Sequence, residues 1–398
     1  MSGGVDSSVT ALLMAQQDYD LRAVFMRNWS TMDEFGSFVA GSGGAAGCEW
    51  QQDWNDVQKV CRHLGGIPVE MIDLSREYWI HVFEPALGDW GSGTTPNPDV
   101  DCNREIKFGA LMDRVIGPSS SSQLSAPQKT WLATGHYAQV AWSPPEADAD
   151  HSTRPMLLRA KDRTKDQSYY LSSVREDRLA HAHFPLAPYL KSEVRQLAIR
   201  HELPTAARKE SMGICFVGNR SRGGAGFSTF LNDYITSSPG DIVDGDGNKV
   251  GRHGGLHTFT LGQGARISGA LQKYFVAKKD TAKNQIVVVQ GKDNPMLLCH
   301  SLNVPSMHWI WDEPPEEVDR PEGAKLLAQV RHRQIEVECT VKRAPGSQGY
   351  AVTFRDPVLA VAPGQTLGLW KDDWCLGSGT IGDVKTVYEV EQAQAKDA

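Results

Sequence analysis

Hydrophobic and polar positions switch along the first third of the chain between the period of a strand and that of a helix. Short apolar runs at 21–26 and 68–74 are typical of buried strands, whereas 53–65 and 75–87 place apolar residues at helical spacing. Ser75 stands where the N-cap of the second of these helices is expected. Strands that alternate with helices of this length predict βαβ units on a parallel sheet. We therefore expect an α/β domain at this end of the chain.

The pattern changes in the second half of the chain. An amphipathic helix is predicted over 188–203, since Pro204 follows it. Clusters of Gly and Pro then break the chain into short segments, and short strands of an all-β module, a small barrel, are predicted at 324–330, 336–343, 349–356 and 368–376. The polar stretch 117–129 reads as a flexible surface insertion. The predicted domains are an α/β domain at 1–207, a small linker domain at 208–291 and a β-rich domain at 292–398.

A loop of small residues, SGGVDSS at 2–8, leads directly into the first predicted helix. Gly3 and Gly4 let the backbone approach a ligand closely, the helix N-terminus attracts negative charge, and Ser7 and Ser8 add hydroxyl groups. This combination predicts an anion-binding loop. It differs from the commoner phosphate loop G-x-x-x-x-G-K-[ST], because no Lys follows the glycines. A Gly-Gly turn capped by Ser or Asp is the alternative that these residues alone leave open.

Composition narrows the function classes. The formal charge of −7 disfavours bulk nucleic-acid binding, although it is compatible with a local basic surface. The 7 cysteines show neither a CxxC pair nor a Cys/His zinc spacing, which indicates reduced thiols and no metal centre. Cys61 and Cys339 fit the buried faces of a predicted helix and strand. No apolar run approaches the roughly 18 residues of a membrane helix.

A second polar cluster, at 94–111, contains Asp99 and Cys102 three residues apart on a predicted loop, ahead of a helix expected from Glu105. A carboxylate beside a thiol at such a junction suits acid–base work, and the helix N-terminus would lower the thiol pKa. The alternative is that Asp99 caps a turn and Cys102 is incidental.

A third cluster, at 208–218, places Cys215 after a Gly-containing turn close to Arg208 and Lys209. Neighbouring cations favour the thiolate, the form that attacks and carries sulfur. A buried Cys at the start of a strand is the equally open alternative.

Seven segments in this order closely resemble the tRNA-specific 2-thiouridylases, over nearly the whole chain: SGGVDSS (2–8), FMRNW (25–29), TPNPDVDCNREIKFG (95–109), ATGHYA (133–138), KDQSYYL (165–171), KESMGICFVG (209–218) and PGQ (363–365). That family belongs to the N-type ATP pyrophosphatases, the PP-loop superfamily. The resemblance implies a Rossmann-like parallel-sheet PP-loop domain, a central linker domain that carries a second catalytic Cys, and a C-terminal β-barrel that binds tRNA.

The resemblance also implies a reaction. ATP, with Mg²⁺, adenylates C2 of the wobble uridine (U34) in the tRNAs for Lys, Glu and Gln, and a cysteine persulfide then delivers sulfur to give 2-thiouridine. Cys215 matches the persulfide carrier, Cys102 the thiol that resolves it through a transient disulfide, and Asp99 the general acid/base. A persulfide sulfur donor protein is the implied partner besides tRNA.

Further residues match binding positions of the family. The nucleotide-binding positions are matched by Ser2, Gly3, Gly4, Asp6, Ser7, Ser8, Met26 and Gly135. Asp6 is also the residue that could organise Mg²⁺ carried by ATP. The target base would be held by Asn97, Pro98 and Asp99. The tRNA-contacting positions are matched by His136, Lys165, Asp166, Gln167, Arg331, Arg333, Gln334 and Gln365.

Two other functions remain open from the sequence. The first is another ATP pyrophosphatase, such as an amidotransferase synthetase or a lysidine-type tRNA modifier, which would lack the paired Cys102 and Cys215. The second is a non-catalytic tRNA-binding protein. The segments 209–218 and 48–58 are more similar to the mitochondrial branch of the family, and no strand precedes Ser2. We therefore expect a mitochondrial matrix enzyme whose transit peptide lies upstream of Met1, with a bacterial-type cytoplasmic enzyme as the alternative.

Overall fold

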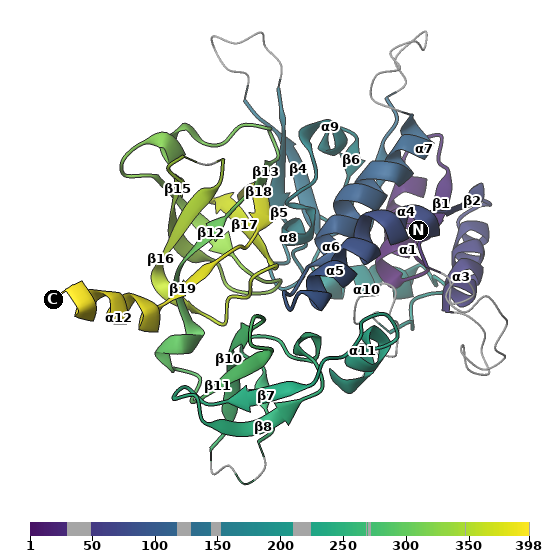
Figure 1. Cartoon of the computed structure of the whole chain (residues 1–398). Helices are drawn as coiled ribbons and strands as arrows, with labels where there is room; N and C mark the ends of the chain where they lie inside the picture. Colours follow the sequence, from purple (N-terminus) through teal and green to yellow (C-terminus); the bar gives the residue numbers. More distant parts are fainter. Residues whose placement is uncertain are drawn as a thin grey trace. The chain divides into compact units, whose positions relative to one another are not determined.

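A computed structural model (Figure 1) describes residues 1–29, 49–117, 129–144, 153–209, 224–267, 269, 272–346 and 348–397. Most of the insertion predicted at 117–129 lies outside these residues. The chain divides into two compact units. Unit 1 comprises 1–83, 99–219 and 373–375, and unit 2 comprises 84–98, 220–372 and 376–398.

Unit 1 is a mixed α/β structure. Its helical segments are α1 (Val5–Ala15), α3 (Glu49–His63), α4 (Ser75–Tyr78), the π-helix η2 (Trp79–Phe83), α6 (Pro98–Asp101), the π-helical segment η3 (Cys102–Leu111), α7 (Met112–Ile116), α8 (Ser168–Leu171), α9 (Glu176–Leu179) and α10 (Lys191–Arg200). Its strands are β1 (Ala23–Arg27), β2 (Val69–Asp73), β3 (Leu132–Ala133), β4 (Ala138–Trp142), β5 (Pro155–Arg159) and β6 (Ala182–His183).

The strands of unit 1 pair mostly in parallel. Strands β1 and β2 run parallel, with Ala23 opposite Val69 and Arg27 opposite Asp73, and β3 pairs with β6 in the same sense. Helix α3 lies between β1 and β2 in sequence and packs its Cys61 into a core with Phe25 of β1. The predicted strand–helix–strand order is therefore confirmed, and Cys61 is the core residue that its spacing indicated.

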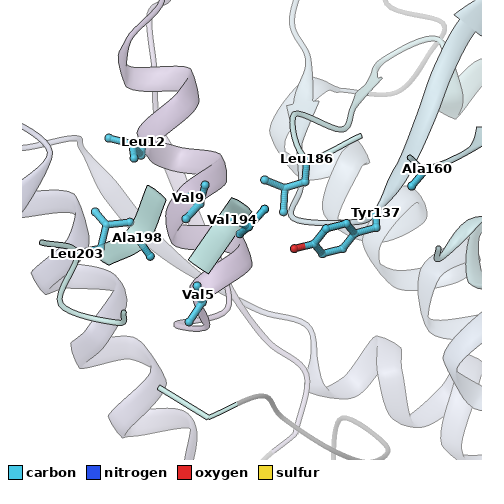
Figure 2. Close-up of a cluster of buried hydrophobic side chains, with 9 residues drawn as sticks. All are labelled: Val5, Val9, Leu12, Tyr137, Ala160, Leu186, Val194, Ala198 and Leu203. Carbon is cyan, nitrogen blue, oxygen red and sulfur yellow. The ribbon is translucent and has the colours of Figure 1, made fainter. Parts of the chain in front are cut away.

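Helices α1 and α10 pack against each other around a shared apolar core (Figure 2). Val9 of α1 and Val194 and Ala198 of α10 are fully buried. Each buried Val contributes roughly 1.5–3 kcal/mol relative to an exposed one. The helix predicted at 188–203 is confirmed in a shorter form, because α10 ends at Arg200.

The start of α4 corrects the expected role of Ser75. Leu74 is the N-cap, and the backbone N–H and the hydroxyl of Ser75 both donate to Asp73 Oδ1, at 3.0 and 2.8 Å. A carboxylate is the better acceptor at a helix N-terminus because the helix dipole adds to the attraction. Asp73 at the end of β2 therefore takes the capping role that the sequence suggested for Ser75.

Unit 2 is mainly β structure. Its helical segments are α5 (Glu84–Gly91), α11 (Gly224–Leu231), α12 (Val387–Asp397) and the 3-10 turns Leu256–Thr258, Pro295–Leu297 and Glu316–Asp319. Its strands are β7 (Gly240–Val243), β8 (Lys249–His253), β9 (Gly264–Ala265), β10 (Tyr274–Asp280), β11 (Gln285–Gln290), β12 (Leu298–Val304), β13 (Met307–Trp309), β14 (Ala324–Gln329), β15 (Val337–Arg343), β16 (Tyr350–Leu359), β17 (Thr366–Lys371), β18 (Trp374–Thr380) and β19 (Val384–Thr386).

Two sheets organise unit 2. The first has the order β8-β7-β11-β10-β9, and the second runs β19-β12-β16-β15-β14-β17-β18, with β13 added on β18. The strands predicted at 324–330, 336–343 and 349–356 are confirmed as β14, β15 and β16. The single strand predicted at 368–376 is wrong, since the chain turns between β17 and β18 at Asp372, whose φ is 54°. Asp tolerates this left-handed conformation better than most residues.

Helices of the described ranges are all too short or too polar to cross a membrane.

Candidate functional site

The predicted anion-binding loop lies at the N-terminus of α1. Gly4 is the N-cap residue, and no side chain caps the helix there. Gly3 has φ of 75°, and a Cβ atom on it would lie 2.7 Å from the carbonyl oxygen of Asp53 and 2.9 Å from Arg208 Nη1. Both its conformation and its crowding therefore require glycine. The helix start that the sequence predicted behind the loop is confirmed, and anion binding by its first backbone N–H groups stays a prediction.

The three loop serines differ in their surroundings. Ser8 is fully buried, and its hydroxyl donates to the carbonyl of Gly4 at 2.8 Å. Ser7 donates to the same carbonyl at 3.1 Å and accepts from the backbone N–H of Ser2 at 3.2 Å. Ser8 therefore shapes the loop from inside, whereas Ser2 and Ser7 lie on its exposed side.

Gly135 comes to the loop from the end of a strand. A Cβ atom on Gly135, just after β3, would lie 2.9 Å from the backbone nitrogen of Ser7 and 3.0 Å from the carbonyl carbon of Asp6. Met26 lies near the end of β1 and is half-buried. Ligands of parallel α/β sheets bind beyond such carboxyl ends, so the position of Gly135 fits a nucleotide site, and the nucleotide-binding role of Met26 stays a prediction.

The carboxylate of Asp6 makes contacts that no motif revealed. Both of its oxygens lie 2.7 Å from Lys191 Nζ, and the Tyr137 hydroxyl donates to Oδ1 at 2.9 Å. Asp6 and Lys191 are separated by 185 positions in sequence, so no local pattern could have linked them. Clusters of three His, Cys, Asp or Glu side chains suited to a metal are absent from the described ranges. Asp6 therefore fits a bound Mg²⁺ only if it exchanges its lysine partner.

Arg208 ties the loop to α3. Its guanidinium donates to the carbonyl of Gly3 at 2.9 Å and to Asp56 Oδ2 at 3.0 Å, and it also pairs with Asp53. Two carboxylates thus offset the positive charge of Arg208, which the sequence suggested would favour the thiolate of Cys215. Cys215 itself lies outside the described residues, and its role stays a prediction.

Asp99 and Cys102 lie on helical structure, one turn apart, which corrects the expected loop. Pro98 begins α6, because proline is favoured at the first position of a helix, and η3 follows directly at Cys102. Cys102 is 2% exposed. The Asn103 side chain donates to the carbonyl of Asp99 at 2.8 Å and fixes this turn. The structure therefore places the carboxyl and the thiol on one helical face.

The protonation of the site is set by burial and by one lysine. Burial raises the pKa of Asp99, and the positive charge of Lys107 partly offsets that rise. Lys107 Nζ lies 3.5 Å from His136 Nε2, and burial together with Lys107 holds the pKa of His136 well below its ordinary value. His136 is therefore neutral at pH 7. A carboxyl group with a raised pKa suits proton exchange near neutral pH.

Two of the four predicted tRNA-contacting residues of unit 1, His136 and Asp166, are buried. His136 is 7% exposed, and its Nδ1 lies 2.8 Å from Thr134 Oγ1. Asp166 is buried, pairs with Arg159 at 3.2 Å, and accepts from the backbone N–H of Ala160 at 2.8 Å.

The neighbours of Asp166 in that predicted set are less buried. Gln167 Oε1 accepts from the backbone N–H of Tyr137 at 3.0 Å, and Lys165 is half-buried. Gln167 therefore anchors the segment that carries Tyr137 toward Asp6.

The corresponding residues of unit 2 fall into two groups. Arg331 and Arg333 are exposed in the turn between β14 and β15, where the side-chain oxygen of Gln334 accepts from the backbone N–H of Val330. Gln365 instead donates its amide to two carbonyl oxygens, at 2.8 Å to Thr95 and 3.0 Å to Pro96.

Gln365 thus holds the segment that leads to Asn97 and Pro98. The backbone N–H of Thr95 also donates to the carbonyl of Pro363, at 3.0 Å. The PGQ segment is therefore a support for the predicted target-base residues.

The structure describes five cysteines, and no disulfide joins any two of them: Cys61, Cys102, Cys299, Cys339 and Cys375. Burial raises the pKa of Cys299 and of Cys339 to about 12, which makes both inert. Cys102 is the one of these five that lies beside a carboxyl group predicted to act in catalysis.

Three family models match the chain in order. They are described as the tRNA methyl transferase HUP domain (residues 1–219), the tRNA methyl transferase PRC-barrel domain (228–290) and the aminomethyltransferase beta-barrel domain (299–381). The predicted fold class, an α/β domain, a small central domain and a C-terminal β-barrel, is thereby confirmed.

Curated relatives match nearly end to end. The tRNA-specific 2-thiouridylase MnmA of Ralstonia nicotianae is 39% identical over 99% of this chain and 98% of its own length. The proteins of the same name from Bacillus licheniformis and Ralstonia pickettii are 39% and 40% identical, over 96% and 99% of this chain and 94% and 98% of their own lengths.

Proposed function

Because the chain belongs to the family of tRNA-specific 2-thiouridylases, we propose that it thiolates C2 of the wobble uridine (U34) in the tRNAs for Lys, Glu and Gln. The family comprises ATP-using enzymes that transfer sulfur to tRNA. The observation that carries the proposal is the pair of Asp99, with its raised pKa, and buried Cys102 one helical turn apart. A ligase or a lysidine-type modifier has no use for that thiol.

ATP binds at the N-terminus of α1 in this proposal. The N–H groups that follow Gly4 and the hydroxyl of half-buried Ser7 hold its phosphates, and Gly3 and Gly135 keep the backbone close. ATP supplies the activation: when O2 of the uridine attacks the α-phosphate, pyrophosphate leaves and C2 carries an AMP leaving group. Mg²⁺ enters with the ATP phosphates, since both oxygens of Asp6 contact Lys191.

Asp99 moves the proton of the first step. The uridine ring must lose its N3 proton as O2 becomes a nucleophile, and the carboxylate of Asp99 accepts it. Because burial raises the pKa of Asp99, its carboxylate is a stronger base than an exposed aspartate. Gln365 supports the nearby Asn97 and Pro98, which hold the base extruded from the anticodon loop.

The two cysteines carry out the sulfur transfer in this proposal. A sulfur donor protein leaves a persulfide on Cys215. The terminal sulfur attacks C2, and the Cys102 thiolate attacks Cys215 Sγ. The S–S bond of the persulfide breaks, AMP leaves, and a disulfide between Cys102 and Cys215 forms. An external thiol reduces this disulfide before the next turnover.

The test is the identity of the nucleotide products. The full chain, incubated with Mg-ATP and unmodified tRNA, should release AMP and pyrophosphate in equal amounts, and only when tRNA is present. Asp6→Ala should lower this release while tRNA binding is retained, because the Asp6 carboxylate contacts Lys191 and Tyr137, which are not among the predicted tRNA-contacting residues. Production of ADP and phosphate would contradict the proposal.

The roles of the site residues, Mg²⁺ and the persulfide donor stay predictions, and so do two further points. They are the location in the mitochondrial matrix and the domain boundaries at 207 and 291.

A further inference from the structure

The nucleotide loop lacks the lysine of the commoner phosphate loop, yet the fold brings an ammonium group to it. Lys191 is the first residue of α10, and its Nζ lies 2.7 Å from each oxygen of Asp6. Asp6 in turn lies in the first turn of α1, where the helix dipole attracts anions.

Core packing fixes the position of this lysine. Val5 and Val9 of α1 pack with Val194 and Ala198 of α10, as Figure 2 shows. The backbone N–H of Lys191 also donates to Asp162 Oδ2 at 2.9 Å. The Lys191 backbone therefore cannot shift far from the loop unless the two helices separate.

Electrostatics explains why a lysine is needed at this point. The carboxylate of Asp6, left alone, would repel the phosphates of ATP beside the same helix N-terminus. Lys191 neutralises it, and the Tyr137 hydroxyl at 2.9 Å holds the carboxylate in place. The Lys191 side chain is 12% exposed, so it is not completely enclosed by the protein. An ammonium group has three donors on a flexible stem and can contact a carboxylate and a phosphate together.

We propose that Lys191 is a phosphate-binding residue of this enzyme, which neutralises Asp6 and donates to the pyrophosphate portion of ATP. The inference rests on the proposed function, because it assigns Lys191 to the part of ATP that departs as pyrophosphate. It gives the loop the cation that its own sequence lacks.

The test is binding of inorganic pyrophosphate, ATP and AMP to the full chain, measured by titration calorimetry. Lys191→Met should weaken binding of pyrophosphate and ATP by about tenfold or more, since a charge-assisted hydrogen bond is lost. Binding of AMP should change by less than about twofold, because AMP lacks the pyrophosphate portion that Lys191 is proposed to contact. Lys161→Met is the matched control. Lys161 is exposed, and its ammonium pairs at 3.3 Å with Glu193, which lies on α10 as Lys191 does. Circular dichroism and thermal unfolding show that each variant folds, and Lys191→Gln replaces Lys191→Met if the latter does not.

The same substitution in an Asp6→Asn variant distinguishes a lysine that binds phosphate from one that only neutralises Asp6. In Asp6→Asn, the carboxylate that Lys191 neutralises is gone. Lys191→Met should still weaken pyrophosphate binding there, whereas a purely supporting lysine would show no further loss.

The inference is overturned if Lys191→Met binds pyrophosphate like the wild type, if its loss vanishes in Asp6→Asn, or if the wild type binds no pyrophosphate. The proposed function fails on a different result, the release of ADP by the wild type.

Discussion

Gln365 offers a prediction in which two roles give opposite results. The family resemblance assigns it a tRNA contact, whereas the structure has its amide donating to the carbonyls of Thr95 and Pro96, at 2.8 and 3.0 Å. Gln365→Met keeps the length of the side chain and removes both donors. Each partly buried hydrogen bond is worth about 0.5–1.5 kcal/mol, so the segment loses about 1–3 kcal/mol of support.

That loss should appear in turnover and not in tRNA affinity. If all of it falls on the ordered form of the segment that precedes Asn97, the population of that form decreases by roughly 5- to 150-fold relative to the disordered one. We expect kcat for 2-thiouridine formation to fall accordingly, while Kd for tRNA, measured by filter binding, stays within about twofold. Gln139→Met, on the exposed side of β4, is the control and should change neither.

The reasoning about Gln365 would be refuted by the reverse pattern. A Kd for tRNA that rises by tenfold with unchanged kcat at saturating tRNA would show that Gln365 binds tRNA directly. An unchanged kcat and an unchanged Kd would show that the two hydrogen bonds do not order the segment.

Three further predictions follow from other parts of the site. Lys107→Met removes the charge that lowers the pKa of Asp99, so this pKa should rise further and the acidic limb of the pH–rate profile should move to higher pH. An acidic limb that does not move would show that Lys107 does not influence the ionisation of Asp99. Gly135→Ala places a methyl group 2.9 Å from the α1 backbone and should weaken ATP binding by at least about tenfold, checked by calorimetry, with thermal unfolding as the control. The double variant Arg331→Ala/Arg333→Ala should weaken tRNA binding and reduce the slope of log Kd against log salt by up to about two, and an unchanged slope would count against a phosphate contact.

The hydrophobic periodicity correctly predicted those helices and strands whose buried face can be recognised from their own sequence. The run at 21–26 and the helices that became α3 and α10 each present one apolar face, and the structure buries those faces. The helix expected from Glu105 begins earlier, because Pro98 is compatible with a first helical turn as well as with a stiff loop. The prediction of one strand at 368–376 missed the turn at Asp372 and Asp373, because the aromatic residues on either side of it favour a strand.

Contacts between distant segments could not be predicted. Lys191 meets Asp6 across 185 positions, Arg208 meets the Gly3 carbonyl across 205, and Gln365 meets Thr95 across 270. Each depends on how helices and turns pack, which a local pattern does not encode. The signal for Lys191 was indirect: an anion-binding loop without its own lysine requires a cation from elsewhere.

The central claim is that Cys215 delivers sulfur to a uridine that ATP has activated, and that Cys102 resolves the persulfide. Single-turnover formation of 2-thiouridine, followed by mass spectrometry of digested tRNA with a persulfide donor and Mg-ATP, tests it most directly. We predict that Cys215→Ser forms adenylated tRNA without 2-thiouridine, that Cys102→Ser retains slow thiolation when an external thiol is supplied, and that Cys339→Ala behaves as the wild type. A wild-type yield of 2-thiouridine from Cys215→Ser would contradict the account.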